Sequence, residues 1–196
     1  MTLIIPDLSH YEKITIEPAA LRTPALINKV SQGSDFSDST WFNRARDIVQ
    51  HGELIGGYHF CTNADPSAQV SLFLKDVRNS LGAVVMPQLK LALDWEDYPQ
   101  AQCSQTQAET MAAAIEVVTG KLPLFYTNLA KYQTITPGSL LLSCDLWLAE
   151  YGPTAKVPCQ LWQFTDSYGG FEGVNVPCDA SKWAADVCSL TDWWAK

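Results

Sequence analysis

The sequence has few charged residues and little positive charge. Of its 196 residues 17% are charged, and 13 Lys and Arg are outnumbered by 21 Asp and Glu, which gives a formal net charge of -8. No run of Lys and Arg occurs. Because neutralised phosphates supply most of the affinity for nucleic acids, the composition argues against nucleic acid as the main partner. It does not argue against a neutral sugar polymer.

Long apolar runs are also absent. No segment approaches the roughly 20 apolar residues that cross a bilayer, so no membrane span is expected. Residues 1–7 lack a basic region followed by a long apolar stretch, which argues against a signal peptide or anchor at this end and for a soluble protein. A leader that was removed, and export that reads no N-terminal signal, both stay open.

The six cysteines are widely spaced and form no C-x-x-C pair, and no paired-histidine pattern accompanies them. A structural zinc site is therefore not expected. The even number permits disulfides, but the sequence does not choose among the pairings. Cys144 and Cys159 lie in apolar runs typical of buried thiols. Cys178 and Cys188 bracket a predicted short helix and are a candidate disulfide pair.

Strand-like and helix-like segments alternate along a chain of which 47% is hydrophobic, enough for a substantial core. We expect strands at 3–5, 25–30, 54–60, 89–93 and 122–127, and helices at about 40–50, from 65 onwards and at 105–119. After residue 140 the pattern is strand-rich, with no room for full crossover helices. This order predicts an α/β fold in which a parallel sheet closes into a barrel.

Asp94-Trp95-Glu96 follows the short alternating run at 89–93. Side chains at i and i+2 of a strand point to the same face, about 6.6 Å apart along the backbone. Two carboxyl groups placed in this way repel each other, so the pKa of one is expected to rise while the other stays ionised. The alternative is a solvated acidic loop that begins where the strand ends.

The barrel prediction favours the catalytic interpretation of these acids. Function in such barrels lies at the C-terminal ends of the strands. Asp7, Asp94 and Glu96 all fall at predicted C-terminal strand ends, so we expect them to converge on one rim. Asp7 by itself is equally typical of a turn or a helix cap.

An ordered series of motifs spans nearly the whole chain and resembles family 25 of the glycoside hydrolases, the N-acetylmuramidase type of lysozyme. The motifs are Asp7-Leu8-Ser9, Lys29-Val30-Ser31-Gln32-Gly33, Gly57-Tyr58-His59-Phe60, Leu93-Asp94-Trp95-Glu96, Pro123-Leu124-Phe125-Tyr126-Thr127, Leu146-Trp147-Leu148-Ala149-Glu150-Tyr151 and Leu161-Trp162-Gln163-Phe164-Thr165-Asp166. Each motif is weak by itself, whereas seven in order are highly specific.

The resemblance implies a modified TIM-like barrel of about five βα units followed by three strands with short or absent helices. This barrel would occupy residues 1–196 as a single catalytic domain and leave no separate cell-wall-binding module. The implied reaction is cleavage of the β-1,4 bond between N-acetylmuramic acid and N-acetylglucosamine in peptidoglycan, with carboxylates alone and without a metal or an organic cofactor.

The resemblance also assigns roles to four acids. Glu96 would be the general acid/base and the protonated member of its pair near neutral pH. Asp94 would be an ionised carboxylate that acts as the nucleophile or orients the acetamido group of the substrate. Asp7 matches the first-strand acid of the family. Asp179 is the nearest counterpart of the last acid, although it equally suits the N-cap of a helix that begins near Ser181.

Three aromatic residues are candidates for a sugar-binding wall, because aromatic faces suit the apolar faces of pyranose rings. They are Tyr58, Tyr126 and Trp162, and each is also typical of a core. Tyr126 stands just before a predicted strand end. His59 is expected to be a hydrogen-bonded core histidine; if it faces outward from the barrel, Tyr58 and Phe60 face inward.

Two positions depart from the family pattern. The opening motif continues as His10-Tyr11-Glu12 where the family has Gln-Gly, and Ser181 stands where the family has Asn. Both departures concern the periphery of the implied cleft and leave the Asp94/Glu96 pair whole. Two other functions stay open: an inert barrel that binds glycan or another protein, and a hydrolase of chitin-like N-acetylglucosamine polymers.

The implied substrate places the protein at the cell wall, outside the cytoplasm, in the periplasm or the extracellular space. A phage endolysin, a toxin delivered by a secretion machine and an enzyme without its leader all fit. For a toxin, an immunity or inhibitor protein that caps the cleft is the expected partner, and a monomer is expected. Trp193-Trp194 is expected to pack the C-terminal tail onto the barrel.

Overall fold

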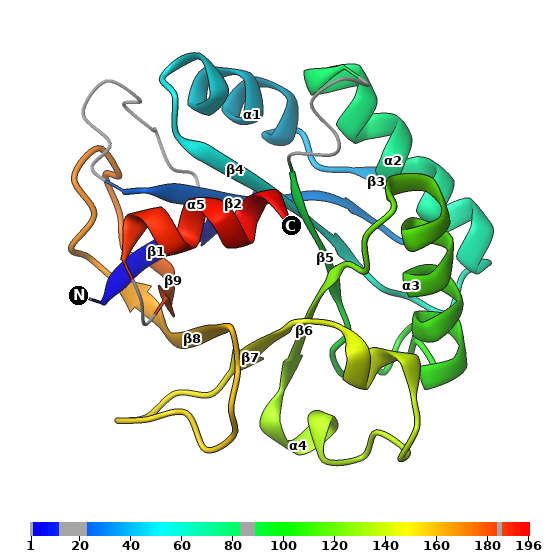
Figure 1. Ribbon diagram of the computed structural model, residues 1–196. Helices are drawn as coiled ribbons and strands as arrows, with labels where there is room; N and C mark the ends of the chain where they lie inside the picture. The colour runs from blue at the N-terminus through cyan, green and yellow to red at the C-terminus, as the bar shows by residue number, and fades with distance from the viewer. Residues whose placement is uncertain (1, 12–22, 83–88, 184–185) are drawn as a thin grey trace.

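The computed structural model describes residues 2–11, 23–82, 89–183 and 186–196. Eight strands in this part of the chain form a closed barrel (Figure 1). They are β1 (Leu3–Leu8), β2 (Ala25–Gln32), β4 (Leu54–Phe60), β5 (Lys90–Asp94), β6 (Leu124–Asn128), β7 (Leu146–Ala149), β8 (Leu161–Tyr168) and β9 (Cys178–Trp183). The two-residue strand β3 (Phe36–Ser37) extends the sheet beyond β2. The predicted modified TIM-like α/β barrel is confirmed.

The barrel closes where β1 pairs with β2, with Asp7 opposite Ile27 and Leu8 opposite Asn28. The strands from β1 to β8 run parallel around the barrel through β2, β4, β5, β6 and β7. The exception is β9, which is antiparallel to both of its neighbours, β8 and β1. The expectation of a purely parallel sheet is therefore wrong for this last strand.

The three long helices cover one side of the barrel (Figure 1). They are α1 (Trp41–Gln50), α2 (Pro66–Leu81) and α3 (Gln105–Thr119), and α2 contacts both of the others. Asp65 caps α2 by accepting a hydrogen bond from the Ala68 N–H. A capping box of Ser104 and Gln107 begins α3, and Gly120 in the left-handed conformation ends it. These local signals explain why the predicted range 105–119 matches the helix.

The second half of the barrel has only short helical segments between its strands, as predicted. After β6 come α4 (Leu129–Tyr132) and the 3₁₀ helix η3 (Leu140–Ser143), each four residues long. In the described part of the chain, no helix is both long and apolar enough to cross a membrane.

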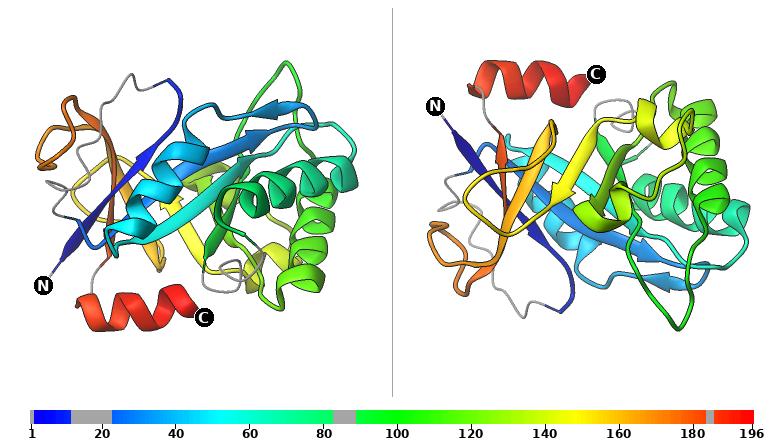
Figure 2. Two further views of the ribbon diagram at one scale, coloured as in Figure 1. Left: turned by 90° about the horizontal axis from the view of Figure 1, so that it is seen from above. Right: turned by 90° about the horizontal axis from the view of Figure 1, so that it is seen from below.

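The C-terminal helix α5 (Val187–Ala195) lies across the end of the barrel at which β1 begins (Figure 2). Trp194 is 1% exposed, and its Nε1 donates a hydrogen bond of 3.0 Å to the Ile55 carbonyl. It belongs to the core cluster inside the barrel together with Trp147 and Leu161. The prediction that the tail packs onto the barrel is confirmed, and this packing leaves the opposite end of the strands for the site.

Two predictions near the C-terminus are wrong. The residues around Ser181 form strand β9 and not a helix, so Asp179 is not an N-cap. Cys178 lies buried in this strand, whereas Cys188 is exposed on α5, and no disulfide joins them. The strand forms because β1 and β8 satisfy its backbone groups on both sides, a tertiary effect that local propensity does not reveal.

Candidate active site

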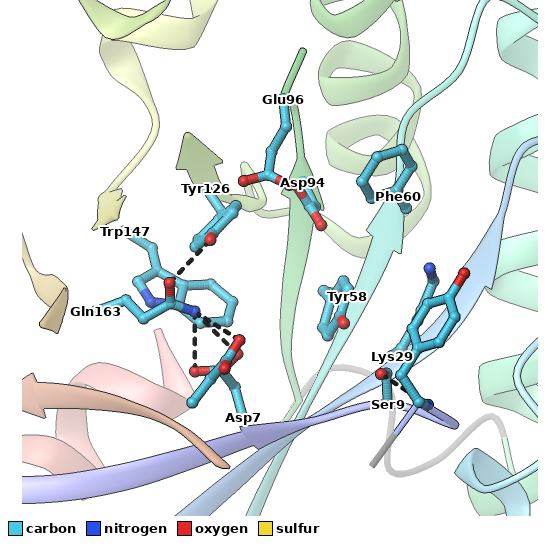
Figure 3. Close-up of a pocket in the computed structure, with 12 residues that line it drawn as sticks. Asp7, Ser9, Lys29, Tyr58, Phe60, Asp94, Glu96, Tyr126, Trp147 and Gln163 are labelled. Carbon is cyan, nitrogen blue, oxygen red and sulfur yellow. Dashed lines mark hydrogen bonds between the residues drawn. The ribbon is translucent and has the colours of Figure 1, made fainter. Parts of the chain in front are cut away.

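An open cavity with about 580 Å³ of empty space lies at the C-terminal end of the parallel strands (Figure 3). Each of the eight barrel strands contributes to its lining. The contributing side chains are Asp7, Lys29, Tyr58, Phe60, Asp94, Tyr126, Trp147, Gln163 and Asp179, joined by Ser9, Tyr11 and Glu96 from the segments that follow strands. The four acids predicted from the sequence thus share one cavity, as do Tyr58 and Tyr126.

Asp94 and Glu96 reach this cavity from the end of β5. Asp94 is the last residue of the strand, and both carboxyl groups point into the cavity (Figure 3). The chain keeps its strand-like path beyond Asp94, because the Trp95 N–H donates to the Tyr126 carbonyl of the neighbouring strand at 2.9 Å. Side chains two residues apart therefore stay on one face, as the alternation predicted.

Burial dominates the electrostatics of Asp94, which is 6% exposed. It raises the pKa of Asp94 well above its ordinary value, and the nearby Glu96 raises it further, while the cationic Lys29 lowers it. Oδ1 of Asp94 is buried and has no hydrogen-bond partner among the described residues. The site thus holds a carboxyl oxygen that needs a donor.

Glu96 is half-buried, and burial is also the main cause that raises its pKa. A hydrogen bond with the Tyr126 hydroxyl lowers the pKa of Glu96, and so does the charge of Lys131. Lys131 lies close by, with Nζ 2.7 Å from the Glu96 carbonyl oxygen and 3.0 Å from Oδ1 of Asp97. Glu96 therefore holds its proton to a higher pH than an isolated glutamic acid.

The two carboxyl groups titrate as a pair, so a proton lost by one is retained more strongly by the other. Since Asp94 is the more deeply buried, burial alone favours Asp94 as the group that keeps the last proton. The sequence predicted the opposite order, with Glu96 protonated and Asp94 ionised. Strand alternation predicts that two side chains lie on the same face of the strand, but it does not predict how deeply each is buried.

Asp7 and Asp179 face each other across the β1–β9 pair, at opposite positions of the antiparallel register. Gln163 of β8 joins them through its amide nitrogen. Nε2 donates to Oδ1 and Oδ2 of Asp7 at 3.1 and 3.3 Å and to Oδ2 of Asp179 at 3.4 Å (Figure 3). The antiparallel last strand therefore brings Asp179 to the cavity, although it lies near the beginning of its strand.

Tyr126 links this acid group to Glu96. Its hydroxyl donates to Oε1 of Gln163 at 3.0 Å and also acts to lower the pKa of the Glu96 carboxyl group. Its ring meets Trp147 edge to face at 4.7 Å, and Tyr58 meets the same tryptophan at 6.3 Å. These three rings form one aromatic group in the cavity, which Phe60 and Tyr11 also line.

Trp162 does not belong to this aromatic wall. Its Nε1 donates to the Glu150 carbonyl at 2.6 Å, and Lys182 lies over its ring at 4.7 Å. The neighbouring Gln163 points into the barrel instead, because successive side chains of a strand alternate. The position of Trp162 therefore does not support its predicted substrate-binding role. The tryptophan that lines the cavity is Trp147 of the preceding strand.

The residues that the sequence did not single out are Lys29, Trp147 and Gln163. Lys29 is 3% exposed, and its Nζ lies 2.7 Å from Oε1 of Gln32 and 4.9 Å from the centre of the Phe60 ring. The available signal was position, since all three occur in the ordered motifs and within barrel strands. Strand alternation around Trp162 would have assigned Gln163 to the inner face if the register had been known.

His59 behaves as expected of a core histidine. It faces outward between the barrel and α2, with Nδ1 2.9 Å from Ser31 Oγ and Nε2 3.2 Å from Gln69 Oε1. Burial lowers its pKa to about 4, so the ring is neutral at physiological pH. Tyr58 and Phe60 consequently point inward, where both line the cavity.

A comparison with family models gives a match that covers every cavity-lining residue except Asp179. The model described as glycosyl hydrolases family 25 matches residues 7–174. This chain belongs to that family. It is accordingly a glycoside hydrolase, and the family predicted from the ordered motifs is confirmed. No curated protein sequence is similar enough to count as a match.

Solved structures of family 25 lysozymes and of related enzymes have the same fold. The bacterial lysozyme from Streptomyces coelicolor is 19% identical, with 98% of this chain and 97% of that chain covered, at a TM-score of 0.82. The catalytic domain of an endolysin from a bacteriophage of Listeria monocytogenes is 19% identical, with 97% of each chain covered, at 0.79. A family 25 lysozyme from Aspergillus fumigatus is 20% identical over 100% of both chains, at 0.78.

The structure locates the two positions that depart from the family motifs in this glycoside hydrolase. Tyr11 lines the cavity and is 75% exposed, and its ring lies against His10 with ring centres 4.1 Å apart and the ring planes tilted by 36°. Ser181 lies inside the barrel, where its Oγ accepts a hydrogen bond of 2.8 Å from Trp147 Nε1. The departure at Tyr11 therefore alters the rim of the cavity, and Ser181 holds the ring of Trp147 in the cavity wall.

Proposed function

We propose that this family 25 glycoside hydrolase is a muramidase, which cleaves the β-1,4 bond between N-acetylmuramic acid and N-acetylglucosamine in peptidoglycan. The observation that carries the proposal is the Asp94/Glu96 pair in an open cavity with the pKa of both groups raised. A carboxyl group that keeps its proton near neutral pH is suited to protonate a glycosidic oxygen.

In this proposal Glu96 is the general acid/base. It donates its proton to the oxygen of the leaving sugar as the bond breaks, and the resulting carboxylate then accepts a proton from the attacking water. Glu96 suits this double role because it is half-buried and therefore more accessible from the cavity than the more deeply buried Asp94.

Asp94 serves the same reaction by orienting the acetamido group of the sugar to be cleaved. Its unpartnered Oδ1 needs a hydrogen-bond donor, and the acetamido N–H provides one. Burial also makes Asp94 a poor permanent anion, which disfavours direct attack on the sugar. If this is correct, walls from which the N-acetyl groups have been removed are not cleaved; efficient cleavage of such walls would favour Asp94 as the nucleophile.

Asp7 and Asp179 complete the acidic side of the cavity and stabilise the positive charge that develops on the sugar ring and acetamido group. Tyr58 and Tyr126 are the proposed aromatic contacts for the pyranose rings. Because the substrate is the cell wall, action outside the cytoplasm follows, by phage lysis, secretion-machine delivery or a removed leader. A capping immunity protein and a monomeric state stay predictions.

Clearing of purified bacterial cell walls tests the proposal. Wild-type protein should clear the suspension, and Glu96→Gln should not. The matched control is Glu116→Gln, the same change at an exposed position of α3, which should clear the walls as fast as wild type. If Glu96→Gln cleared walls like wild type, the role of Glu96 as the general acid would fail. If wild type bound walls without clearing them, the muramidase proposal would fail. Faster cleavage of N-acetylglucosamine polymers than of walls would favour the chitin-type alternative.

A further inference from the structure

A second open cavity, the side cavity, adjoins the catalytic cavity that holds the acid pair, and Tyr11 lines both of them. The side cavity has about 660 Å³ of empty space, which is within the range of roughly 300–1,000 Å³ typical of small-molecule sites. Gln32, Asp35, Phe36 and Thr62, which lie at or beyond the ends of β2 and β4, line the side cavity and not the catalytic one. A ligand that is longer than the catalytic cavity can therefore extend past Tyr11 into a second site.

Three aromatic rings form one wall of the side cavity. The ring of His10 contacts those of Tyr11 and Phe36, with ring centres 4.1 and 4.9 Å apart. His10 is itself fixed, because its backbone N–H donates to Oδ2 of the buried Asp38 at 2.9 Å and its Nδ1 lies 2.8 Å from the same oxygen. Nζ of Lys29 lies 5.8 Å from the ring centres of both Tyr11 and Phe36, within reach of a cation–π attraction. These contacts hold the two rings in place although both are exposed.

The exposed rings and their polar neighbours match the apolar and polar surfaces of a sugar. Tyr11 is 75% and Phe36 36% exposed, and an aromatic face suits the apolar face of a pyranose ring. Gln32 accepts from Nζ of Lys29 through Oε1 at 2.7 Å, so its NH₂ group is the part of the amide that can donate to a ligand. The exposed carboxylate of Asp35 can accept hydrogen bonds from hydroxyl or acetamido N–H groups. The side cavity thus offers a stacking face together with a donor and an acceptor.

We propose that the side cavity is a further sugar-binding subsite, in which an N-acetylhexosamine ring of the glycan strand stacks on Tyr11 and Phe36 while the strand is cleaved in the catalytic cavity. This inference rests on the proposed function, because an enzyme that cuts within a glycan strand also has to hold sugars beyond the cleaved bond. Tyr11 belongs to one of the two departures from the family motifs. The subsite is therefore expected of this chain and not of every member of its family.

A neutral sugar suits the side cavity better than the peptide stem of peptidoglycan, which carries carboxylates. Among the described residues that line this cavity none is a Lys or an Arg, and the carboxylate of Asp35 repels other anions. The charge of the nearby Lys29 is already engaged, because this side chain is buried and its Nζ bonds to Gln32. An uncharged ring that carries hydroxyl groups meets no such repulsion.

Calorimetric titration of the Glu96→Gln variant with peptide-free glycan strands of about eight sugars tests the inference, because this variant should bind the strands without cutting them. In this background Phe36→Ala should weaken binding about tenfold, as expected for the loss of one stacked ring. Tyr11→Ala should weaken binding at least as much, because Tyr11 lines both cavities. The matched control is Phe42→Ala, the same change at an exposed phenylalanine of α1 outside the lining of the two cavities, which should bind like its parent.

Strands of the same length with and without peptide stems separate the two possible occupants. An equal loss for both kinds of strand in Phe36→Ala supports a stacked sugar, whereas a loss confined to peptide-bearing strands would overturn it in favour of the stem. Unchanged binding in both Phe36→Ala and Tyr11→Ala would overturn the subsite itself. If Phe36→Ala does not fold, Phe36→Leu decides, because it keeps an apolar side chain without an aromatic face and should still weaken binding.

The inference and the proposed function fail in different ways. Wild-type protein that binds strands but does not cleave walls would refute the proposed function, and the binding comparison would still decide the inference because it needs no cleavage. Wild-type protein that cleaves walls, together with unchanged binding in the Phe36 and Tyr11 variants, would refute the inference alone. If peptidoglycan strands do not bind, N-acetylglucosamine polymers of the same length replace them, and absence of binding to either glycan would overturn the inference.

Discussion

Replacing His59 is expected to remove a large part of the acid sensitivity of folding. His59 is 0% exposed and bonded to Ser31 and Gln69, and its pKa falls from 6.5 to about 4. Between these two pH values the unfolded chain binds a proton at His59 that the folded chain does not bind. Acidification therefore stabilises the unfolded state, and stability is lost as the pH falls from 6.5 towards 4.

The size of the effect follows from the shift. Each pKa unit corresponds to about 1.4 kcal/mol, so His59 should account for a loss of about 3 kcal/mol in the free energy of unfolding between pH 7 and pH 4. Asp94 and Glu96 act in the opposite direction, because a raised pKa makes the folded state bind protons first. The comparison must therefore be made against a variant and not on wild type alone.

Urea unfolding of wild type and His59→Gln at several pH values between 4 and 8 measures this difference. The variant has no group that titrates at this position, so the other titrations cancel in the difference between the two proteins. The difference should change by about 3 kcal/mol over the range, in the direction of relative loss for wild type at acidic pH. If the free energy of unfolding depended on pH in the same way in both proteins, the inference that burial lowers the pKa of His59 would be refuted.

Three other predictions follow from the same structure. Trp194→Ala removes the buried ring that seals the barrel end and its bond to Ile55, so it should cost about 3–5 kcal/mol and lower Tm by about 10 °C in thermal unfolding, whereas a change below about 1 kcal/mol would contradict the packing. Lys29→Met removes a positive charge that lowers the pKa of both Asp94 and Glu96. The alkaline limb of the pH–activity profile should therefore move to higher pH, and a move to lower pH would contradict this. Cys188 is the exposed cysteine, and a maleimide should label it first in the folded protein, as peptide mapping can check.

Much of the fold could be predicted because its signals are local. Capping residues and a terminal glycine define α3, and short apolar runs define the strands β1, β2, β4, β5 and β6. Strand β9 was missed because its sequence, Cys178–Trp183, is mostly small and polar. Its conformation depends on pairing with two strands that are distant in the sequence.

The sequence was sufficient to predict the acidic residues of the site, but it predicted the other side chains of the site less well. Asp7, Asp94 and Glu96 were placed on one rim because strand ends of a barrel meet there. Trp162 and Gln163 show the limit, since the face of a residue depends on strand register and neighbouring side chains point in opposite directions. The relative burial of Asp94 and Glu96 also depends on tertiary packing, which the sequence does not contain.

The reducing ends released from purified peptidoglycan test the central claim most directly. Wild-type protein should release fragments that end in N-acetylmuramic acid, and Glu96→Gln should release none above the level of an untreated sample. Fragments that end in N-acetylglucosamine, or equal release by wild type and Glu96→Gln, would contradict the account of Glu96 as the general acid of a muramidase.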